Sequence, residues 1–157
     1  MDSSHLSLLV SLDHTAAFDT INHQKLLQRL SSEYGLCSLA LKWLETYLVG
    51  RTQYVRVGQA SGPLTPCLTG VPQGSVLGPL LFSIYISPIS RLIGSHGVLH
   101  HKYADDTTLY VKLGNQPDND TAIFEQCLTD TATWFLENDM QLNQSKSEAM
   151  LQLRDRR

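Results

Sequence analysis

An adjacent pair of aspartates, Asp105 and Asp106, is the feature that most constrains how this chain folds. The flanking segments, residues 98–104 and 107–112, are rich in β-branched and aromatic residues, which predicts a hairpin with the aspartates at its turn. A further carboxylate, Asp13, ends an apolar run far upstream. Adjacent carboxylates repel each other unless a cation lies between them, and a divalent metal ion is the usual one. The pattern therefore predicts a metal site at strand ends.

The remaining segments predict helices between short strands. We expect a buried strand over 6–12, helices over 22–32 and 36–48, a hairpin over 53–57 and 64–68, a helix from Pro79 to Tyr85, a helix from Asp120 or Thr121 with Ile123 facing inwards, and a closing strand over 149–153. Residues 70–78 contain three glycines and a proline, which predicts a constrained loop. This order suits a mainly antiparallel sheet with helices packed on one face, so the predicted fold class is α+β.

Composition predicts one globular domain over residues 1–157. The chain has 42% hydrophobic residues and no apolar run that approaches the roughly 18 residues of a membrane span. Its three cysteines are widely spaced and odd in number, which favours a reducing, intracellular setting without deciding between nucleus and cytoplasm. The net charge of -3 lacks the basic excess of a phosphate-backbone binder. We expect basic contact surfaces to lie in parts absent from this chain.

Five blocks in this order resemble the reverse transcriptases of non-LTR (LINE-type) retrotransposons. The blocks are LDHTAAFDT at residues 12–20, WLETYLVGR at 43–51, GVPQGSVLGPLLF at 70–82, YADD at 103–106 and LNQSKSE at 142–148. The resemblance implies a polymerase palm-like antiparallel sheet with helices on one face. It also implies that the chain is a palm fragment of one reverse transcriptase domain, with the fingers partial, and the thumb and endonuclease regions belonging to the full element.

The resemblance assigns Asp13, Asp105 and Asp106 as catalytic carboxylates that bind two Mg²⁺ ions, with Mn²⁺ as a substitute. Hard carboxylate oxygens suit these ions, which serve two-metal transfer of a deoxynucleotide to a primer 3′-hydroxyl on an RNA template. Lys146 matches a lysine that protonates the pyrophosphate leaving group. The implied partners are therefore an RNA template, a DNA primer and a deoxynucleoside triphosphate.

The resemblance also implies a nucleotide-binding set, which comprises Ala16, Ala17, Phe18, Gln73, Gly74 and Tyr103. Phe18 matches an aromatic gate that excludes a ribose 2′-hydroxyl, because a bulky apolar wall leaves that group no room and no partner. Gln73 matches a residue that contacts nucleotide and template. Arg51 matches a basic position, for which a nucleic-acid contact and a plain surface role both stay open. Asp19 is expected to support the turn after Asp13.

Simpler interpretations stand beside these roles. The aspartate pair alone is typical of a solvated turn, Phe18 of a core residue, and Lys146 of an exposed side chain. His100 and His101 are expected to be structural, because neighbours in a strand face opposite ways. Two alternative functions remain: an inactive retrotransposon remnant that serves as an interaction module, and a nucleotide cyclase on a palm-like sheet. The block around Gln73 and the block around Lys146 both argue against the cyclase.

Overall fold

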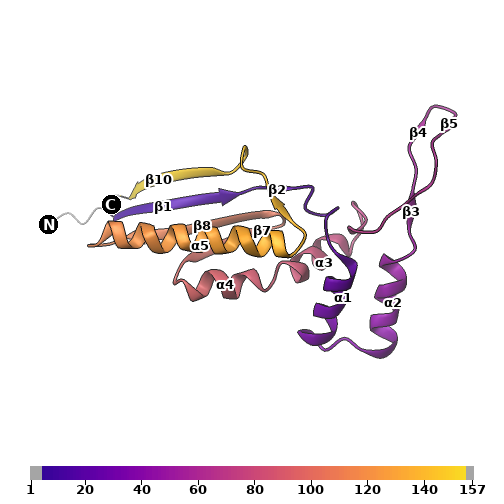
Figure 1. Cartoon of the computed structure of the whole chain (residues 1–157), viewed down its shortest axis with the longest axis horizontal. Helices are drawn as coiled ribbons and strands as arrows, with labels where there is room; N and C mark the ends of the chain where they lie inside the picture. The colour runs from indigo at the N-terminus through magenta and orange to yellow at the C-terminus, as the bar shows by residue number, and fades with distance from the viewer. Residues whose placement is uncertain (1–4, 155–157) are drawn as a thin grey trace. The chain divides into compact units, whose positions relative to one another are not determined.

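The computed structural model describes residues 5–154 and divides into two compact units (Figure 1). The first unit joins residues 1–17 to residues 86–157, and the second consists of residues 18–85. We describe each unit by itself. Whether the two behave as the single domain expected from composition stays a prediction.

A four-stranded antiparallel sheet forms the first unit, in the order β10-β1-β8-β7. Its strands are β1 (His5–Leu12), β7 (Leu99–Tyr103), β8 (Asp106–Leu113) and β10 (Glu148–Arg154). The predicted hairpin is β7 with β8, and the predicted closing strand is β10. Strand β1 lies between β8 and β10, so segments from opposite ends of the sequence pair along its whole length.

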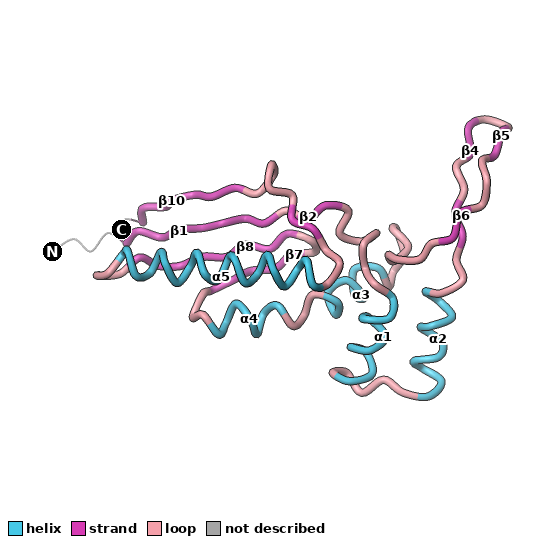
Figure 2. Tube along the Cα trace, viewed as in Figure 1, coloured by secondary structure: helices cyan, strands magenta, loops and turns pink. Residues whose placement is uncertain are grey.

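Two helices, α4 (Ile89–Ser95) and α5 (Pro117–Glu137), pack on one face of this sheet (Figure 2). Strand alternation sends Thr107 and Leu109 into the core on that face and leaves Tyr110 and Lys112 exposed. From α5, the core receives Phe124, Cys127 and Phe135. This mixture of helices and antiparallel sheet confirms the predicted α+β class and the packing of helices on one face.

Several details of this unit differ from the sequence prediction. Helix α5 begins at Pro117 rather than at Asp120 or Thr121, because a proline in the first turn loses no hydrogen bond that a helix would make. Ile123, expected to face inwards, is exposed. Helix α4 was not predicted, and Pro88 precedes it as its N-cap residue.

Strand β1 is only half-buried, whereas its continuous apolar run predicted a buried strand. Along β1, Leu12 is buried and residues 6–11 are intermediate. The difference arises because helices cover only one face of the sheet. A second small ladder, β2 (His14–Thr15) with β9 (Gln141–Leu142), follows β1 and was not predicted, since two-residue strands carry no periodic signal.

Helices and a long hairpin form the second unit. Its elements are α1 (His23–Ser32), α2 (Ser38–Leu48), β3 (Thr52–Gln53), β4 (Arg56–Val57), β5 (Ala60–Ser61), β6 (Thr65–Pro66) and α3 (Gly78–Tyr85). Asn22 caps α1 as predicted, since its side-chain oxygen accepts hydrogen bonds from the backbone N–H groups of Gln24 and Lys25 at 3.0 and 3.1 Å. The core centres on Leu26, Leu48 and Phe82, all fully buried.

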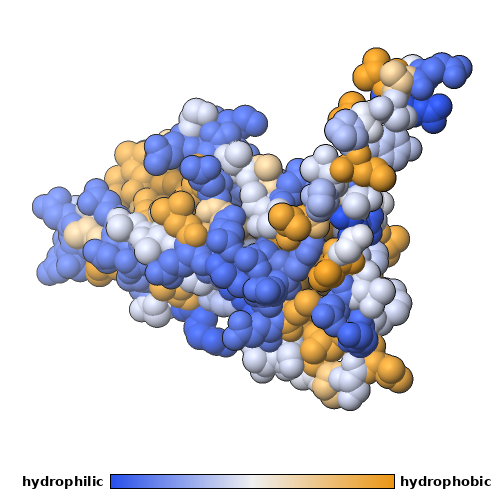
Figure 3. All heavy atoms as spheres, turned by 45° about the vertical axis from the view of Figure 1, so that its right-hand side comes forward, coloured by the Kyte–Doolittle hydropathy of each residue, from blue (hydrophilic) through white to orange (hydrophobic). Residues whose placement is uncertain are grey.

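The hairpin β3 to β6 extends beyond the end of α2 and carries exposed apolar residues among polar ones (Figure 3). These residues are Tyr54, Val55, Val57 and Leu64. Trp43 of α2 is 59% exposed and stacks on Tyr47 with ring centroids 5.9 Å apart. Within residues 5–154, no helix combines the length and apolar character that crossing a membrane requires.

Candidate functional site

The three predicted carboxylates lie at one end of the sheet in the first unit. Tyr103 pairs with Asp106 across the hairpin, which leaves Ala104 and Asp105 as the turn, and Leu12 of β1 pairs with Thr107 of β8. Continuing that register by one residue sets Asp13 opposite Asp106. Since Leu12 and Thr107 are buried, alternation directs Asp13 and Asp106 to the sheet face that lies away from the helices. The backbone therefore brings these two carboxylates to one place.

Their side chains make no protein contacts that would neutralise them. Within the described part of the chain, Asp13, Asp105 and Asp106 accept no side-chain hydrogen bond and join no ion pair. Nor do any three His, Cys, Asp or Glu side chains among residues 5–154 gather into a set able to hold a metal ion. The oxygen donors fit Mg²⁺ in chemistry and in strand register, but their side chains must turn towards one another to bind it.

Backbone strain marks both segments that carry the carboxylates. Ala104, in the turn before Asp105, has φ = 53°, and Ala16, three residues after Asp13, has φ = 49°. This left-handed region disfavours any side chain larger than glycine's hydrogen, and it is retained mostly where the surrounding structure requires it. Such outliers beside candidate carboxylates are typical of functional sites.

The turn that holds Lys146 is tied to Asp13. The backbone N–H of Asn143 donates to the Asp13 carbonyl at 2.8 Å, and the Asp13 N–H donates to the Ser147 hydroxyl at 3.3 Å. Lys146 lies between these two anchors and is exposed. The structure thus brings the LNQSKSE block to the strand end that carries the first carboxylate, and the proton-donor role of Lys146 stays a prediction.

His14 is a further feature of this end of the sheet, and no role was predicted for it. Its ring is buried against Phe135, with centroids 4.3 Å apart, and neither ring nitrogen has a hydrogen-bond partner in the described structure. Burial lowers the pKa of His14, and the negative charges of Asp105, Asp13 and Asp106 partly oppose that shift. The residue after Asp13 is thus a buried imidazole with a lowered pKa.

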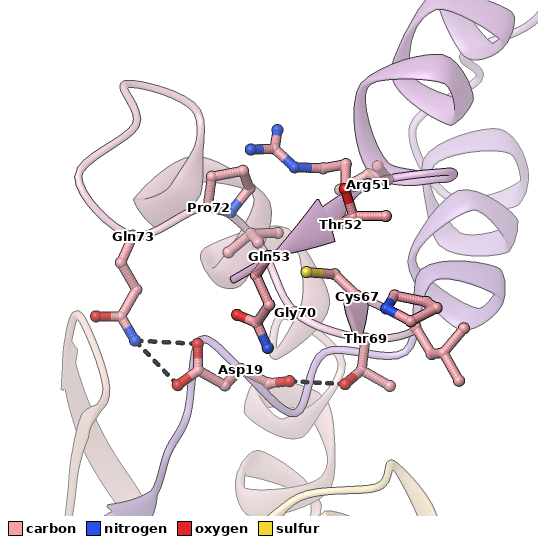
Figure 4. A pocket seen from close by; sticks show the side chains of 13 residues that line it. Asp19, Arg51, Thr52, Gln53, Cys67, Thr69, Gly70, Pro72 and Gln73 are labelled. Atoms are coloured by element: carbon pink, nitrogen blue, oxygen red, sulfur yellow. Dashed lines mark hydrogen bonds between the residues drawn. The ribbon is translucent and has the colours of Figure 1, made fainter. Parts of the chain in front are cut away.

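A polar cavity of about 720 Å³ occupies the second unit (Figure 4). Arg51, Asp19 and Gln73 contribute side chains to its lining. The Gln73 amide nitrogen donates to both carboxylate oxygens of Asp19, each at 3.0 Å. The sequence assigned Gln73 to nucleotide binding and Asp19 to turn support, and this contact between them was missed because their separation of 54 residues leaves no periodic signal.

Asp19 is held firmly at the wall of this cavity. The Thr69 hydroxyl donates to its carbonyl at 2.8 Å, and the N–H of Gly70 donates to the carbonyl of Ile21 at 2.8 Å. Gly70 has φ = +86°, and a Cβ there would lie 2.9 Å from the Asp19 Cα. Only glycine allows the two segments to come this close.

The other predicted nucleotide-binding residues are divided between the units. Phe18 is half-buried, and its ring lies 4.9 Å from the ring of Phe82 in the second unit. Gly74, also in the second unit, has φ = +75° with open space around it. Tyr103 is 76% exposed beside the aspartate turn. The two units are not placed relative to each other, so the joining of these residues into one nucleotide site stays a prediction.

Comparison with known proteins gives consistent matches. The family model described as "Reverse transcriptase (RNA-dependent DNA polymerase)" matches residues 2–156. The RNA-directed DNA polymerase from mobile element jockey of Drosophila melanogaster is 31% identical over 118 residues, which cover 71% of this chain and 13% of that protein. A Pol polyprotein from the type-1 retrotransposable element R2 of Popillia japonica is 32% identical over 88% of this chain and 20% of its own length. These relatives belong to non-LTR elements, as the sequence motifs predicted.

Solved structures show the same fold at low sequence identity. Telomerase from Candida tropicalis, in a form truncated from the C-terminal domain, covers 94% of this chain with a TM-score of 0.69 and 14% identity. Telomerase from Candida albicans with a telomeric RNA fragment covers 92% with a TM-score of 0.72 and 12% identity. The chain spans about 30% of each telomerase and less than a quarter of either mobile-element protein named above.

Proposed function

Because this chain belongs to the reverse transcriptase family, we propose that it carries the palm chemistry of an RNA-directed DNA polymerase. The observation that supports this most directly is the convergence of Asp13 and Asp106 at one sheet end, with Asp105 in the adjoining turn. The reaction joins a deoxynucleotide to a primer 3′-hydroxyl on an RNA template. The chain spans only part of the length of these relatives, and we expect residues 1–157 alone to show weak activity or none.

Each residue of this end has a role in the proposal. Asp13, Asp105 and Asp106 would hold two Mg²⁺ ions, which supply Lewis-acid activation of the primer hydroxyl and charge stabilisation at the triphosphate. The Lys146 ammonium carries a proton within the turn anchored to Asp13 and donates it to the departing pyrophosphate oxygen. The backbone N–H groups of Ala16 and Ala17 bind phosphate oxygens, since small side chains allow close approach.

The second unit supplies nucleic-acid contacts in this proposal. Phe18, supported by Phe82, closes the space that a ribose 2′-hydroxyl would fill. Gln73 and Gly74 approach the nucleotide and the template from their loop. Arg51, whose guanidinium lies 5.7 Å from the Tyr47 ring centre, contributes positive charge to the cavity and contacts a phosphate.

Metal binding by the isolated chain is the first test. We expect Mn²⁺, followed by electron paramagnetic resonance, to bind the wild-type chain and to bind at least tenfold more weakly to Asp105→Asn. Glu125→Gln, which alters an exposed carboxylate of α5, is the matched control and should retain wild-type affinity. Equal affinity in all three proteins would overturn the metal role of Asp105.

Primer extension tests the activity itself. With an RNA template, a DNA primer and Mg²⁺, we expect little or no extension by the isolated chain, and extension by a longer protein that includes it. Robust, processive synthesis by residues 1–157 would overturn the first expectation.

The inactive remnant or interaction module is the second candidate. It is favoured by the absence of a preassembled metal-binding set among residues 5–154. Primer extension by a longer protein distinguishes the polymerase from the remnant. A longer protein that binds Mn²⁺ but never extends a primer would support the remnant.

A further inference from the structure

We propose that Asp19 is a positioning residue that fixes the Gln73 side chain, so that its carbonyl oxygen faces outward to accept a hydrogen bond from the nucleic acid. The proposal rests on the proposed function in one respect, namely that nucleic acid is the ligand of this cavity. The geometry between the two side chains stands independently of it.

The direction of the Gln73 amide follows from the chemistry of its partner. An ionised carboxylate only accepts hydrogen bonds, so the group that faces Asp19 must be the amide NH₂ and not the carbonyl. The nitrogen lies 3.0 Å from both carboxylate oxygens (Figure 4). The carbonyl oxygen therefore points away from Asp19, and it accepts no hydrogen bond from the described residues.

Asp19 can hold this orientation because its own backbone is fixed. Its carbonyl accepts the Thr69 hydroxyl, and the segment that follows it is joined to the next loop by the Gly70 N–H to Ile21 bond. The backbone of Gly70 passes so close to Asp19 that a Cβ added at Gly70 would lie 2.9 Å from the Asp19 Cα. Gln73 itself is exposed and adjoins a glycine with positive φ, so little else restrains its side chain.

This arrangement selects the chemical class of the bound group. A negative carboxylate behind the amide polarises it, which strengthens the outward carbonyl as an acceptor. A phosphate offers only acceptors and is repelled by Asp19, so the matching group is a hydrogen-bond donor. In nucleic acid, the donors are base N–H groups and, in RNA, the ribose 2′-hydroxyl. Gln73 is thus assigned to a base or a sugar, not to the backbone phosphate.

The side-chain geometry is tested by nuclear magnetic resonance on the ¹⁵N-labelled chain. We expect the Gln73 NH₂ signals, assigned by their loss in Gln73→Ala, to differ in shift and to exchange more slowly than those of exposed Gln144. In Asp19→Ala they should move to values typical of Gln144. Gln73 NH₂ signals that already match those of Gln144 in the wild type would show that Asp19 does not hold the Gln73 side chain.

Binding to an RNA overhang tests the consequence. A labelled DNA primer annealed to a longer RNA template is titrated with each variant, and fluorescence anisotropy gives the affinity. We expect Gln73→Ala and Asp19→Ala each to weaken binding about fivefold, as the loss of one good hydrogen bond does. The double variant should be no weaker than Gln73→Ala, because Asp19 acts through Gln73.

Asp19→Ala also removes a negative charge, which by itself should strengthen RNA binding. A weaker affinity in this variant is therefore a stringent test of the positioning role. Removing a carboxylate favours RNA binding, so Glu125→Ala, an exposed carboxylate of the first unit, should bind as well as or better than wild type. A DNA template of the same sequence lacks the 2′-hydroxyl, so it distinguishes the two possible hydrogen-bond donors, the ribose 2′-hydroxyl and the base N–H groups. An Asp19→Ala defect confined to RNA identifies the 2′-hydroxyl, and an equal defect on both templates identifies a base.

Two results would overturn the inference. The first is that Asp19→Ala binds RNA as tightly as Glu125→Ala does. The second is that the losses of affinity in Asp19→Ala and Gln73→Ala add up in the double variant. Either result would show that Asp19 does not act through Gln73. A wild-type chain that binds neither template would overturn the assignment of nucleic acid as the ligand of this cavity, whereas the proposed function is tested by the metal-binding and primer-extension experiments. In that case the amide spectrum still decides whether Asp19 positions Gln73.

Discussion

The carboxylates of the two units differ in what holds them. In the first unit, Asp13, Asp105 and Asp106 gather at a strand end with no hydrogen-bonding or ionic partner in the described structure. In the second unit, Asp19 accepts two hydrogen bonds from Gln73, and its backbone is fixed by its neighbours. Unpartnered like charges cost stability unless a cation joins them, whereas a bonded carboxylate contributes to it. The first arrangement agrees with the proposed metal role only if a bound cation offsets the repulsion, whereas the second agrees with the proposed positioning role as it stands.

Gly70→Ala should produce the largest effect and tests how firmly Asp19 is held. The new methyl group would lie 2.9 Å from the Asp19 Cα at a positive φ, so we expect a loss of about 3 kcal/mol or more in the free energy of unfolding. Urea denaturation measures the change. Gly74→Ala is the matched control, since it has a similar φ with open space around it. An equal loss in both variants would mean that the close approach to Asp19 contributes nothing.

His14→Leu tests whether the first unit carries the cost of unpaired polar groups. Removing two buried, unbonded ring nitrogens should raise the free energy of unfolding by about 1–2 kcal/mol. The pKa of His14 is lowered in the folded state, so the unfolded chain takes up a proton first, near an ordinary pKa of about 6.5. Wild-type stability should therefore fall relative to the variant as pH drops below that value. A difference independent of pH would contradict the protonation argument.

A pair of isosteric variants, Asp106→Asn and Asp19→Asn, should change stability in opposite directions. Without divalent metal, Asp106→Asn relieves repulsion at the strand end and should stabilise the chain by about 0.5–1 kcal/mol. Asp19→Asn weakens the contact with Gln73 and should destabilise it slightly. Adding Mg²⁺ should raise the melting temperature of the wild type and of Asp19→Asn more than that of Asp106→Asn. Changes of the same sign in both variants would remove the distinction between the two kinds of carboxylate.

Ala104→Gly should have the smallest effect and concerns the turn that presents Asp105. Glycine adopts the observed φ of 53° without strain, but it loses more backbone entropy on folding, so we expect a net gain of a few tenths of a kcal/mol. Thermal denaturation detects such a shift. Ala17→Gly, at a buried alanine without positive φ, should instead destabilise the chain. A loss at Ala104 as large as that at Ala17 would show that the turn is not strained.

Local chemistry made much of this fold predictable from the sequence. The cap at Asn22, the β7–β8 hairpin and the glycine-rich loop each depend on residues close together in the chain. The short ladder of β2 with β9 and the exposure of Trp43 depend instead on distant partners, which no local pattern records. For the same reason candidate site residues could be named from local motifs and remain predictions, whereas the Asp19 to Gln73 contact and the burial of His14 could not be predicted.

The central position of β1 also has a consequence for synthesis of the protein. Ser11 of β1 pairs with Glu148 of β10, so β1 waits for a partner strand that is synthesised about 137 residues later. At about 5–20 residues per second, that wait is on the order of ten seconds. During it, the apolar residues Leu6, Leu8 and Leu9 lie on a strand with at least one unpaired edge. The sheet that presents the carboxylates is thus completed late. A ribosome that stalls before β10 would leave an aggregation-prone intermediate with an unpaired strand edge.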